Sequence, residues 1–329
     1  MDIHTLVRGT PEYPAELLRL DDPPLCVRVR GCLPPRERMI AIVGTRGASE
    51  RALRFAEELA EKLAQHDCAI VSGGALGIDT RAHEGALRGR GATLIVHASG
   101  LQHAYPRENA ELFDRAVLGG GGGLSEHPDD APPLKRNFLA RNRLIAALAR
   151  AVIVIEAPFP SGALSTAHTA LKLGVPLLAV PAFPGDANAD GSNLLLRLGA
   201  RPCLSEEDAL TQLDNAPATP LPPRLLLGPK KARSSETLSS ARPSRAPSAP
   251  RRPRSESVAS AQSSLALDLP PELASVLQAV GTEHLDLDTL AARTGLAFEV
   301  LQARVTELEL MGALSLDAAG RFVASARNR

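Results

Sequence analysis

The sequence contains no tryptophan, two tyrosines and seven phenylalanines, so aromatic side chains make up 3% of its 329 residues. This composition disfavours broad base-stacking platforms and the aromatic clefts of carbohydrate-binding proteins. Cysteine is also scarce, and none of Cys26, Cys32, Cys68 and Cys203 forms a C-x-x-C pair, which excludes a zinc ribbon and a thioredoxin-like motif. No other metal-binding spacing such as H-E-x-x-H is present, so we expect neither a metal nor a cofactor.

Long apolar runs are missing as well. The longest, residues 144–157, contains Arg150 and Glu156 and is shorter than the ~20 apolar residues that cross a bilayer. The first residues contain no apolar segment of the kind found in signal peptides. We therefore expect a cytoplasmic protein with no membrane partner, in which the cysteines are reduced.

Net charge is absent too, since 37 basic side chains balance 37 acidic ones, whereas nucleic-acid binders usually carry a basic surplus. The net charge of zero is the sum of segments that differ in charge. Residues 214–268 hold nine basic and four acidic groups, and residues 269–324 hold three and eight. Residues 39–213 hold 17 basic and 19 acidic groups. The total therefore does not exclude a local basic site.

The length predicts about two domains of ~150 residues. Residues 214–268 are rich in Pro, Ser, Ala and Arg and bury too little apolar surface to offset their conformational entropy. We predict a disordered linker there, whose cations form a solvated tether or touch phosphates loosely. The predicted organisation is a short N-terminal extension (1–38), a main domain (39–213), this linker and a C-terminal domain (269–324).

The main domain alternates short apolar runs with helical patterns. The runs are 39–43, 68–72, 93–98, 152–156 and 177–180, and the helical patterns are 50–65, 80–87, 108–116, 138–149 and 162–173. Alternation of this kind predicts an α/β fold, a Rossmann-like parallel sheet with helices on both faces. Its ligands are expected at the carboxyl ends of the strands.

The C-terminal domain has three helical patterns, 271–280, 286–293 and 298–311, followed by the short apolar pair 313–316 and 321–323. This order predicts a small winged helix-turn-helix. Its third helix carries Glu299, Glu307 and Glu309 against Arg304, and an acidic helix is a poor partner for DNA phosphates. We hypothesise that this domain contacts protein or its own chain.

Three predicted strands end in turns that precede a helix. Helix N-termini offer unpaired N–H groups and a positive dipole end, which together suit a polyanion, and the guanidinium of Arg46 suits phosphate. Each turn is alternatively a plain strand-to-helix connection. The residues concerned are Gly44, Thr45 and Arg46 in the first turn, Gly73 and Gly74 in the second, and Ser161, Gly162 and Thr166 in the third.

The strongest electrostatic feature is residues 135–143, which hold four cations and no acidic residue around a single phenylalanine. Cations can follow a phosphate backbone while a ring stacks on a base, so the segment is typical of a single-stranded nucleic-acid site. The alternative is a solvated basic helix end. The candidate residues are Lys135, Arg136, Asn137, Phe138, Arg141, Asn142 and Arg143.

Two other features allow two interpretations each. Asp79 and His83, four residues apart, form either an acid–base pair or a helix cap followed by a buried histidine. The five glycines 119–123 form either a flexible loop or a bend close to another backbone. No G-x-S-x-G motif and no serine with an assigned base is present.

The ordered series of motifs resembles the DNA-processing protein A family (DprA, also called Smf) from about Tyr13 through Leu213. The series includes Ile42 to Arg46, Gly77-Ile-Asp with His83, Tyr105-Pro, and Leu124-Ser-Glu126. It continues with Lys135, Phe138 and Arg141 to Arg143, then Val154 to Ala157, Ser161-Gly to Ala167, Val180-Pro and Gly191 to Asn193. A C-terminal winged helix is also typical of the family.

The resemblance implies a non-enzymatic, dimeric protein that binds single-stranded DNA during natural transformation and loads the RecA recombinase on it. It places Arg46, Lys135 and Phe138 in the DNA pocket, with the ring on a base. The family usually has arginine where this chain has Leu76, which removes one phosphate contact. Its Ser-Gly motif usually continues Ser-Leu-Ile, where this chain has Ala163-Leu-Ser.

Two other classes of function compete with this interpretation. A phosphoribohydrolase-like enzyme would need a catalytic glutamate in a P-G-G-x-G-T-x-x-E turn, and residues 160–168 contain none. A transcription regulator would read duplex DNA with its winged helix, which the acidic third helix disfavours.

Overall fold

The structure is a computed structural model that describes residues 2–158, 161–214, 271–310, 313–316 and 321–324. The chain divides into two compact units, residues 1–225 and 226–329, which are considered separately. The predicted linker lies outside the described residues apart from Asp214. Residues 317–320, between the predicted apolar runs 313–316 and 321–323, and residues 325–329 also lie outside the described residues.

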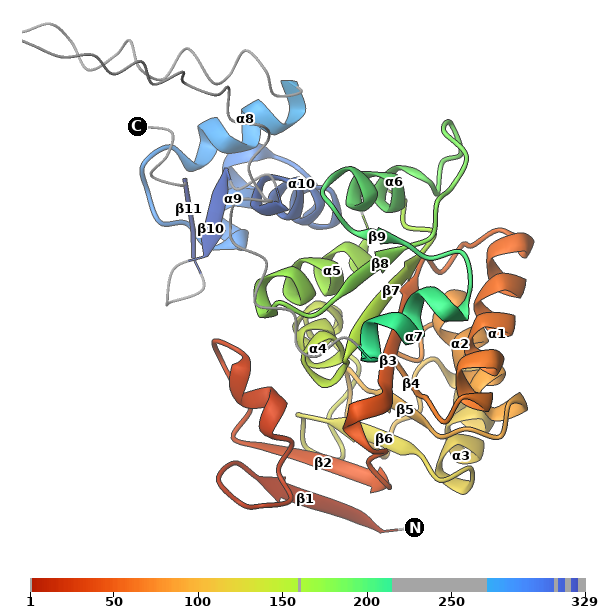
Figure 1. The fold of residues 1–329 in the computed structure, drawn as a ribbon. Coiled ribbons are helices and arrows are strands. Elements are labelled where there is room, and N and C mark those ends of the chain that lie inside the picture. The colour runs from red at the N-terminus through yellow and green to blue at the C-terminus, as the bar shows by residue number, and fades with distance from the viewer. Residues whose placement is uncertain (1, 159–160, 215–270, 311–312, 317–320, 325–329) are drawn as a thin grey trace, which may run out of the picture. The chain divides into compact units, whose positions relative to one another are not determined.

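The first unit is built on one sheet, whose described strands lie in the order β1-β2-β6-β5-β4-β3-β7-β8-β9 (Figure 1). Strands β3 to β9 pair in parallel, while β1 and β2 run antiparallel at one edge. Because β4 and β7 flank β3 on opposite sides, the chain reverses its direction of strand addition there. The strands are β1 Ile3–Val7, β2 Cys26–Gly31, β3 Met39–Gly44, β4 Ala69–Ser72, β5 Thr93–Val96, β6 Gly122–Ser125, β7 Ala151–Ile155, β8 Leu177–Ala179 and β9 Arg201–Pro202.

Helices cover both faces of this sheet (Figure 1). One face is covered by α1 Glu50–Gln65, α2 Ile78–Arg88, α3 Ala110–Leu118 and α7 Glu206–Asp214. The other is covered by α4 Lys135–Leu148 and α5 Gly162–Leu173, while α6 Asp190–Arg197 follows β8. The short helices are η1 Ala15–Arg19, η2 Arg36–Arg38 and η3 Arg107–Asn109. The predicted Rossmann-like fold is confirmed.

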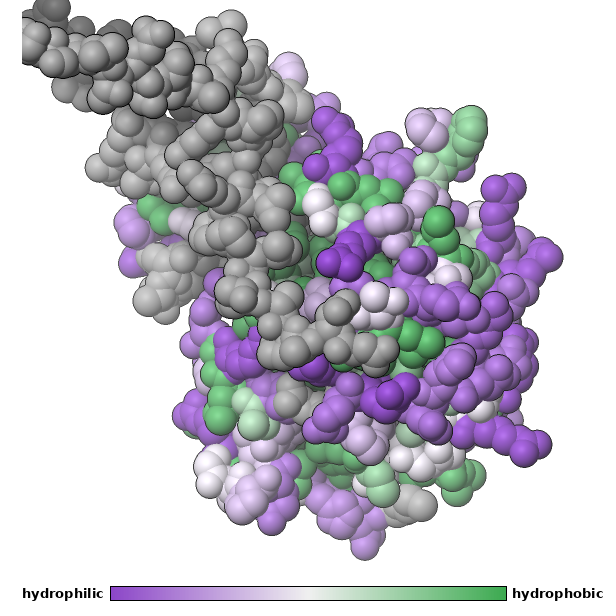
Figure 2. Space-filling model, viewed as in Figure 1, coloured by the Kyte–Doolittle hydropathy of each residue, from purple (hydrophilic) through white to green (hydrophobic). Residues whose placement is uncertain are grey.

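The core follows from the near-continuous apolar character of the central strands. All five residues of β7 are buried, as is expected for a parallel strand covered on both faces. On the α1 side, Ile40, Ile42 and Ile153 pack against Leu59, Leu63 and other apolar residues of the helices. The viewed surface of the first unit is mostly hydrophilic, with hydrophobic residues in separate small patches (Figure 2).

Two strands that the sequence interpretation lacked complete the sheet. The segment 1–38, predicted as a separate extension, contributes β1 and β2 to the same sheet through β6. Its signal was the alternation of Val27 and Val29, both buried, with Arg28 and Arg30. Strand β6 was hidden because it starts within the glycine run. A Cβ on Gly121 would lie 2.0 Å from the Thr93 carbonyl oxygen, so the glycines lie against another backbone.

The second unit has the predicted order of elements. Helices α8 Pro271–Val280, α9 Leu287–Thr294 and α10 Phe298–Leu310 precede strands β10 Leu314–Leu316 and β11 Phe322–Ala324, which pair antiparallel. Asp286 caps α9 by accepting a hydrogen bond from the Thr289 N–H at 2.7 Å, and Gly295 ends it in the left-handed conformation. Leu273, Leu301 and Phe322 contribute to a core of its own. The winged-helix prediction is confirmed.

Within the described residues, none of the helices combines the length and the apolar character that crossing a bilayer requires.

Two buried histidines make the stability of the first unit depend on pH. Burial, together with positive charge nearby, lowers the pKa of His83 to about 3 and that of His97 to about 3. In the unfolded chain both titrate near ~6.5. Protonation therefore favours the unfolded state, and the stability present above pH ~6.5 is lost as the pH falls towards 3. We expect the free energy of unfolding to fall by ~2 kcal/mol per histidine between pH 7 and pH 5.

Urea unfolding at both pH values measures this loss. His97→Leu is expected to remove ~2 kcal/mol of it, and the exposed His4→Gln should leave it unchanged. An equal pH dependence in the wild type and His97→Leu would contradict the assignment.

Candidate functional site

The loops that follow β3 and β4 meet at the carboxyl edge of the sheet. The Ile78 N–H donates to the Thr45 carbonyl oxygen at 3.3 Å. Gly77 has a φ of +89°, and a Cβ there would lie 2.5 Å from the same oxygen. A larger residue at 77 would therefore displace the loop that carries Arg46.

A cation and two aromatic rings lie together at this edge. The guanidinium carbon of Arg46 is 5.7 Å from the centre of the Phe138 ring, within the range of a cation–π interaction. The Tyr105 ring, from the loop after β5, meets Phe138 edge to face with centroids 5.3 Å apart. Tyr105 is exposed, Arg46 is exposed and Phe138 is half-buried. The three side chains form a ring–cation cluster accessible to solvent.

Helix α4 begins beside this cluster with two exposed cations, Lys135 and Arg136. Its first turn contains no acidic residue and its N-cap, Leu134, makes no side-chain hydrogen bond. Positive side chains at the positive end of a helix dipole are unfavourable for the helix by ~0.3–1 kcal/mol each. An anion bound there would relieve this repulsion, and the placement therefore suits phosphate.

The other polar residues of the 135–143 segment face into the protein. Asn137 and Asn142 are buried, and Asn142 donates to the Gly162 carbonyl oxygen at 3.0 Å. Arg143 is half-buried and forms an ion pair with Glu126 at 2.6 Å. The helix therefore turns Lys135 and Arg136 to solvent, while a structural set faces the protein: Asn137, Arg141, Asn142 and Arg143.

Arg141 belongs to the structural set and lies at the centre of it. It is 4% exposed, and its guanidinium donates to the carbonyl oxygens of Gly73, at 2.6 Å, and Val96. A Cβ on Gly73 would lie 2.5 Å from that guanidinium, so glycine is required for the approach. Burial lowers the pKa of Arg141 to about 10, opposed by the attraction of Asp79, so it stays charged at pH 7. A direct contact of Arg141 with DNA is incompatible with this burial.

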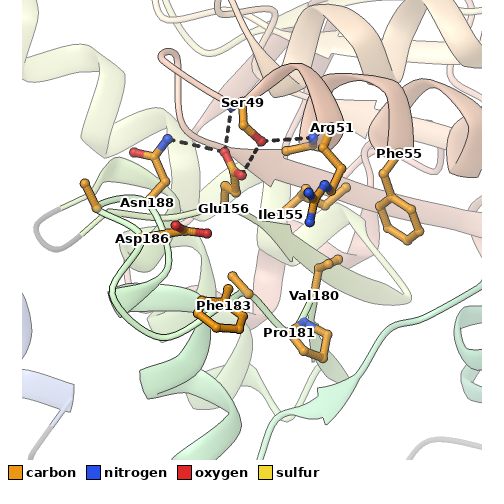
Figure 3. A pocket seen from close by; sticks show the side chains of 13 residues that line it. Ser49, Arg51, Phe55, Ile155, Glu156, Val180, Pro181, Phe183, Asp186 and Asn188 are labelled. Atoms are coloured by element: carbon orange, nitrogen blue, oxygen red, sulfur yellow. Dashed lines mark hydrogen bonds between the residues drawn. The ribbon is translucent and has the colours of Figure 1, made fainter.

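Ser49, the N-cap residue of α1, already has an anionic partner (Figure 3). The Glu156 carboxylate, at the end of β7, accepts from the Ser49 N–H at 2.8 Å and from the Ser49 hydroxyl at 2.5 Å. Asn188 donates to the same carboxylate at 3.3 Å. The N–H and hydroxyl of Ser49, which caps α1, are therefore already paired with a resident carboxylate.

The turn after β4 is occupied in the same way. The Asp79 carboxylate accepts from the N–H groups of Gly73, at 3.1 Å, and Ala75, at 3.4 Å. Burial raises the pKa of Asp79 although Arg141 and these hydrogen bonds oppose it. His83 instead bonds the Thr93 hydroxyl through Nδ1 at 2.7 Å. Asp79 and His83 thus have separate partners, which favours the structural interpretation over an acid–base pair.

The other predicted turn residues are placed as follows. Gly44 ends β3, and Gly74 has a left-handed backbone against Phe113. Ser161 caps α5 by accepting from the Ala163 N–H at 3.2 Å, Gly162 is exposed and Thr166 is 1% exposed. Of these, Ser161 and Gly162 remain within reach of a ligand, whereas Thr166 is buried.

Tyr105 is the site residue that the candidate set lacked. It is one of two tyrosines in the chain, and its Tyr-Pro pair was noted only as a family motif. Leu76, where the family usually has arginine, is 42% exposed at the same edge and provides no cation. Within the described residues, no group of three or more His, Cys, Asp or Glu side chains is placed to hold a metal ion.

Comparison with known proteins decides the family. A family model described as DNA recombination-mediator protein A matches residues 4–214, which include the sheet from the second residue of β1 onward and the ring–cation cluster. The chain belongs to the DNA-processing protein A family. A second model, described as the DprA winged helix domain, matches residues 259–318.

Relatives within the DprA family support this over most of the chain. The Smf protein of Synechocystis is 33% identical over 329 aligned residues, which cover 96% of this chain and 79% of that protein. The DprA of Bacillus subtilis is 36% identical over 217 residues, or 64% of this chain and 71% of its own.

Two solved DprA structures resemble the first unit. The Streptococcus pneumoniae protein is 34% identical with a TM-score of 0.58, over 64% of this chain and 74% of its own. The Helicobacter pylori protein is 33% identical with a TM-score of 0.57, over 64% and 95%, and its structure concerns its single-stranded DNA binding mode. This chain is therefore a member of a family of DNA-processing recombination mediators.

Proposed function

We propose that this chain binds single-stranded DNA at the ring–cation cluster and acts as a recombination mediator. The observation that carries the proposal is the meeting of Arg46, Tyr105 and Phe138 beside the exposed cations of α4. A ring on which a base stacks, flanked by cations that contact phosphates, is the arrangement that single strands require. Binding is expected to be largely independent of sequence and sensitive to salt.

The DNA contacts are assigned to the outward residues. Arg46, Lys135 and Arg136 contact phosphate, and Phe138 contacts a base with Tyr105 beside it. Gly44, Thr45, Gly73 and Gly74 shape the loops. Arg141, Asn142 and Arg143 act on DNA only indirectly, by fixing α4 against the sheet.

The finer role follows from the family. The protein would act in the cytoplasm as a homodimer, protect DNA taken up during natural transformation, and load RecA on it without catalysing a reaction. A gel-shift assay with a single-stranded oligonucleotide, with and without RecA, tests both the DNA binding and the RecA loading. RecA is expected to join the complex and to replace the protein on the strand. If the protein binds the strand but leaves RecA filament formation unchanged, the loading role is contradicted and DNA binding stands.

The winged-helix unit is expected to contribute little to DNA affinity. Arg293 pairs with Glu283 at 2.5 Å, and Arg304 pairs with Glu272 and Glu307. Both arginines are neutralised by these pairs, and residues 269–324 hold three basic and eight acidic groups. Phosphates would therefore be repelled.

Deleting residues 269–329 is predicted to change the Kd for a single-stranded oligonucleotide by less than about threefold, or ~0.7 kcal/mol. The first unit has its own core and should remain folded. Fluorescence anisotropy on the full and shortened chains measures the change, and a large loss of affinity would overturn this assignment.

A further inference from the structure

A cavity of about 510 Å³ lies beside the ring–cation cluster, between the start of α1 and the loop that joins β8 to α6. Its volume is within the ~300–1,000 Å³ of ordinary ligand sites. Glu156 at the end of β7 and Val180 after β8 line it, so it opens at the carboxyl edge of the sheet. The reversal of strand order between β3 and β7 is at the same place, which is where ligands bind in open α/β sheets.

Part of the wall of this cavity is apolar and includes two aromatic rings. Phe55, on α1, and Phe183, on the β8–α6 loop, lie on opposite sides of it (Figure 3). Phe55 is half-buried, whereas Phe183 is 76% exposed at the opening. Flat heterocycles are suited to apolar walls of this kind, since every nucleobase has a π-face.

The polar end of the cavity is held rigidly to the Arg46 loop. Glu156 has a φ of +41°, a conformation that is unfavourable for a non-glycine residue and persists only where the surroundings enforce it. Here its carboxylate is bound by Ser49 and Asn188, and Asn188 also donates to the Gly47 carbonyl oxygen at 2.9 Å. The cavity and the ring–cation cluster therefore share the 45–49 turn.

The charges select the part of a nucleotide that enters. Two carboxylates, Glu156 and Asp186, line the interior and would repel phosphate. They can accept hydrogen bonds from the N–H groups of a base. Arg51 also lines the cavity and is exposed, five residues along the chain from Arg46. A phosphate backbone could run between these two arginines while a base enters the cavity.

We propose that this cavity is a second base-binding site for the same single strand, an inference that rests on the proposed function. One base stacks at Phe138 and Tyr105, the backbone crosses the 45–49 turn, and another base occupies the cavity between Phe55 and Phe183. The 45–49 turn thereby separates two base-binding sites, the first at Phe138 and Tyr105 and the second in the cavity.

Phe183→Ala in the full chain tests the second base-binding site. Anisotropy titrations use labelled oligothymidines of increasing length, with Leu118→Ala as control because Leu118 is 78% exposed on α3. The wild type is expected to gain affinity in two steps as the length grows. Phe183→Ala should keep the first step and lose the second, with about a tenfold loss for long strands, within the range for stacking of one base.

The outcomes distinguish failure of the second base-binding site from failure of single-stranded DNA binding itself. If Phe183→Ala binds strands of every length with unchanged affinity, the second base-binding site is contradicted and the proposed single-strand binding stands. An equal loss at every length would also overturn it, because the residue would then act through the first site. If the wild type does not bind the oligothymidines at all, the proposed function itself fails.

Discussion

Arg141→Ala is expected to lower the free energy of unfolding by ~3–5 kcal/mol, the cost of removing one partner from a buried charged network. The side chain is 4% exposed and satisfies the carbonyl oxygens of Gly73 and Val96. Alanine would leave both oxygens without this donor. It would also remove the positive charge that lowers the pKa of Asp79 against the effect of burial. Since domains are stable by only ~5–15 kcal/mol, the loss is a large fraction of the total.

Arg136→Ala is the matched control, because Arg136 is exposed on the same helix. Its effect on stability is expected within ~0.5 kcal/mol. Urea unfolding followed by circular dichroism measures both variants. Similar stabilities for Arg141→Ala and Arg136→Ala would show that the buried network contributes little, and would reopen a direct role for Arg141 at the DNA.

Phe138→Ala is expected to weaken single-stranded DNA binding by ~1–3 kcal/mol, or about 5- to 150-fold, because it removes the ring on which a base stacks. The dependence of affinity on salt should stay as in the wild type, since no charge is removed. Lys135→Ala should instead reduce the slope of log K against log salt by ~0.7, the value for one phosphate contact on a single strand.

Anisotropy titrations at several salt concentrations separate the two effects. Phe298→Ala is the control, because Phe298 is a partly exposed ring in the winged-helix unit. Wild-type affinity in both Phe138→Ala and Lys135→Ala would contradict the assigned site. A change of salt slope in Phe138→Ala would mean that the ring acts by positioning Arg46, which lies over it.

The fold could be predicted where local pattern and burial agree. The buried strands β3, β7 and β8 and the helix α5 were expected within a residue or so, because runs such as Val152 to Ile155 suit only a strand covered on both faces. Strand β6 could not be predicted in this way. Its glycines have low strand propensity and are held there by the backbones of its neighbours β2 and β5.

The structure divides the candidate residues that the sequence marks as one segment. The sequence marks residues 135–143 as a basic segment around one ring, yet Arg141 and Arg136 are the same residue type in the same helix. Which of them faces solvent depends on how α4 rests on the sheet, and that is a property of the packed core. Tyr105 lies 33 positions before Phe138 in the chain, and only the fold brings their rings to 5.3 Å.

The sequence by itself determined the fold class, the family motifs and the presence of cations and a ring near the strand ends. These features depend on residue types and on periodicity, which act locally along the chain. Only the tertiary structure decided that Glu156 bonds Ser49, that Asp79 bonds the N–H groups of the turn after β4, that Arg141 is internal, and that Ser49 and Arg51 line a cavity. Such facts depend on distances between residues far apart in the chain, and these distances are fixed by the packing of helices on the sheet.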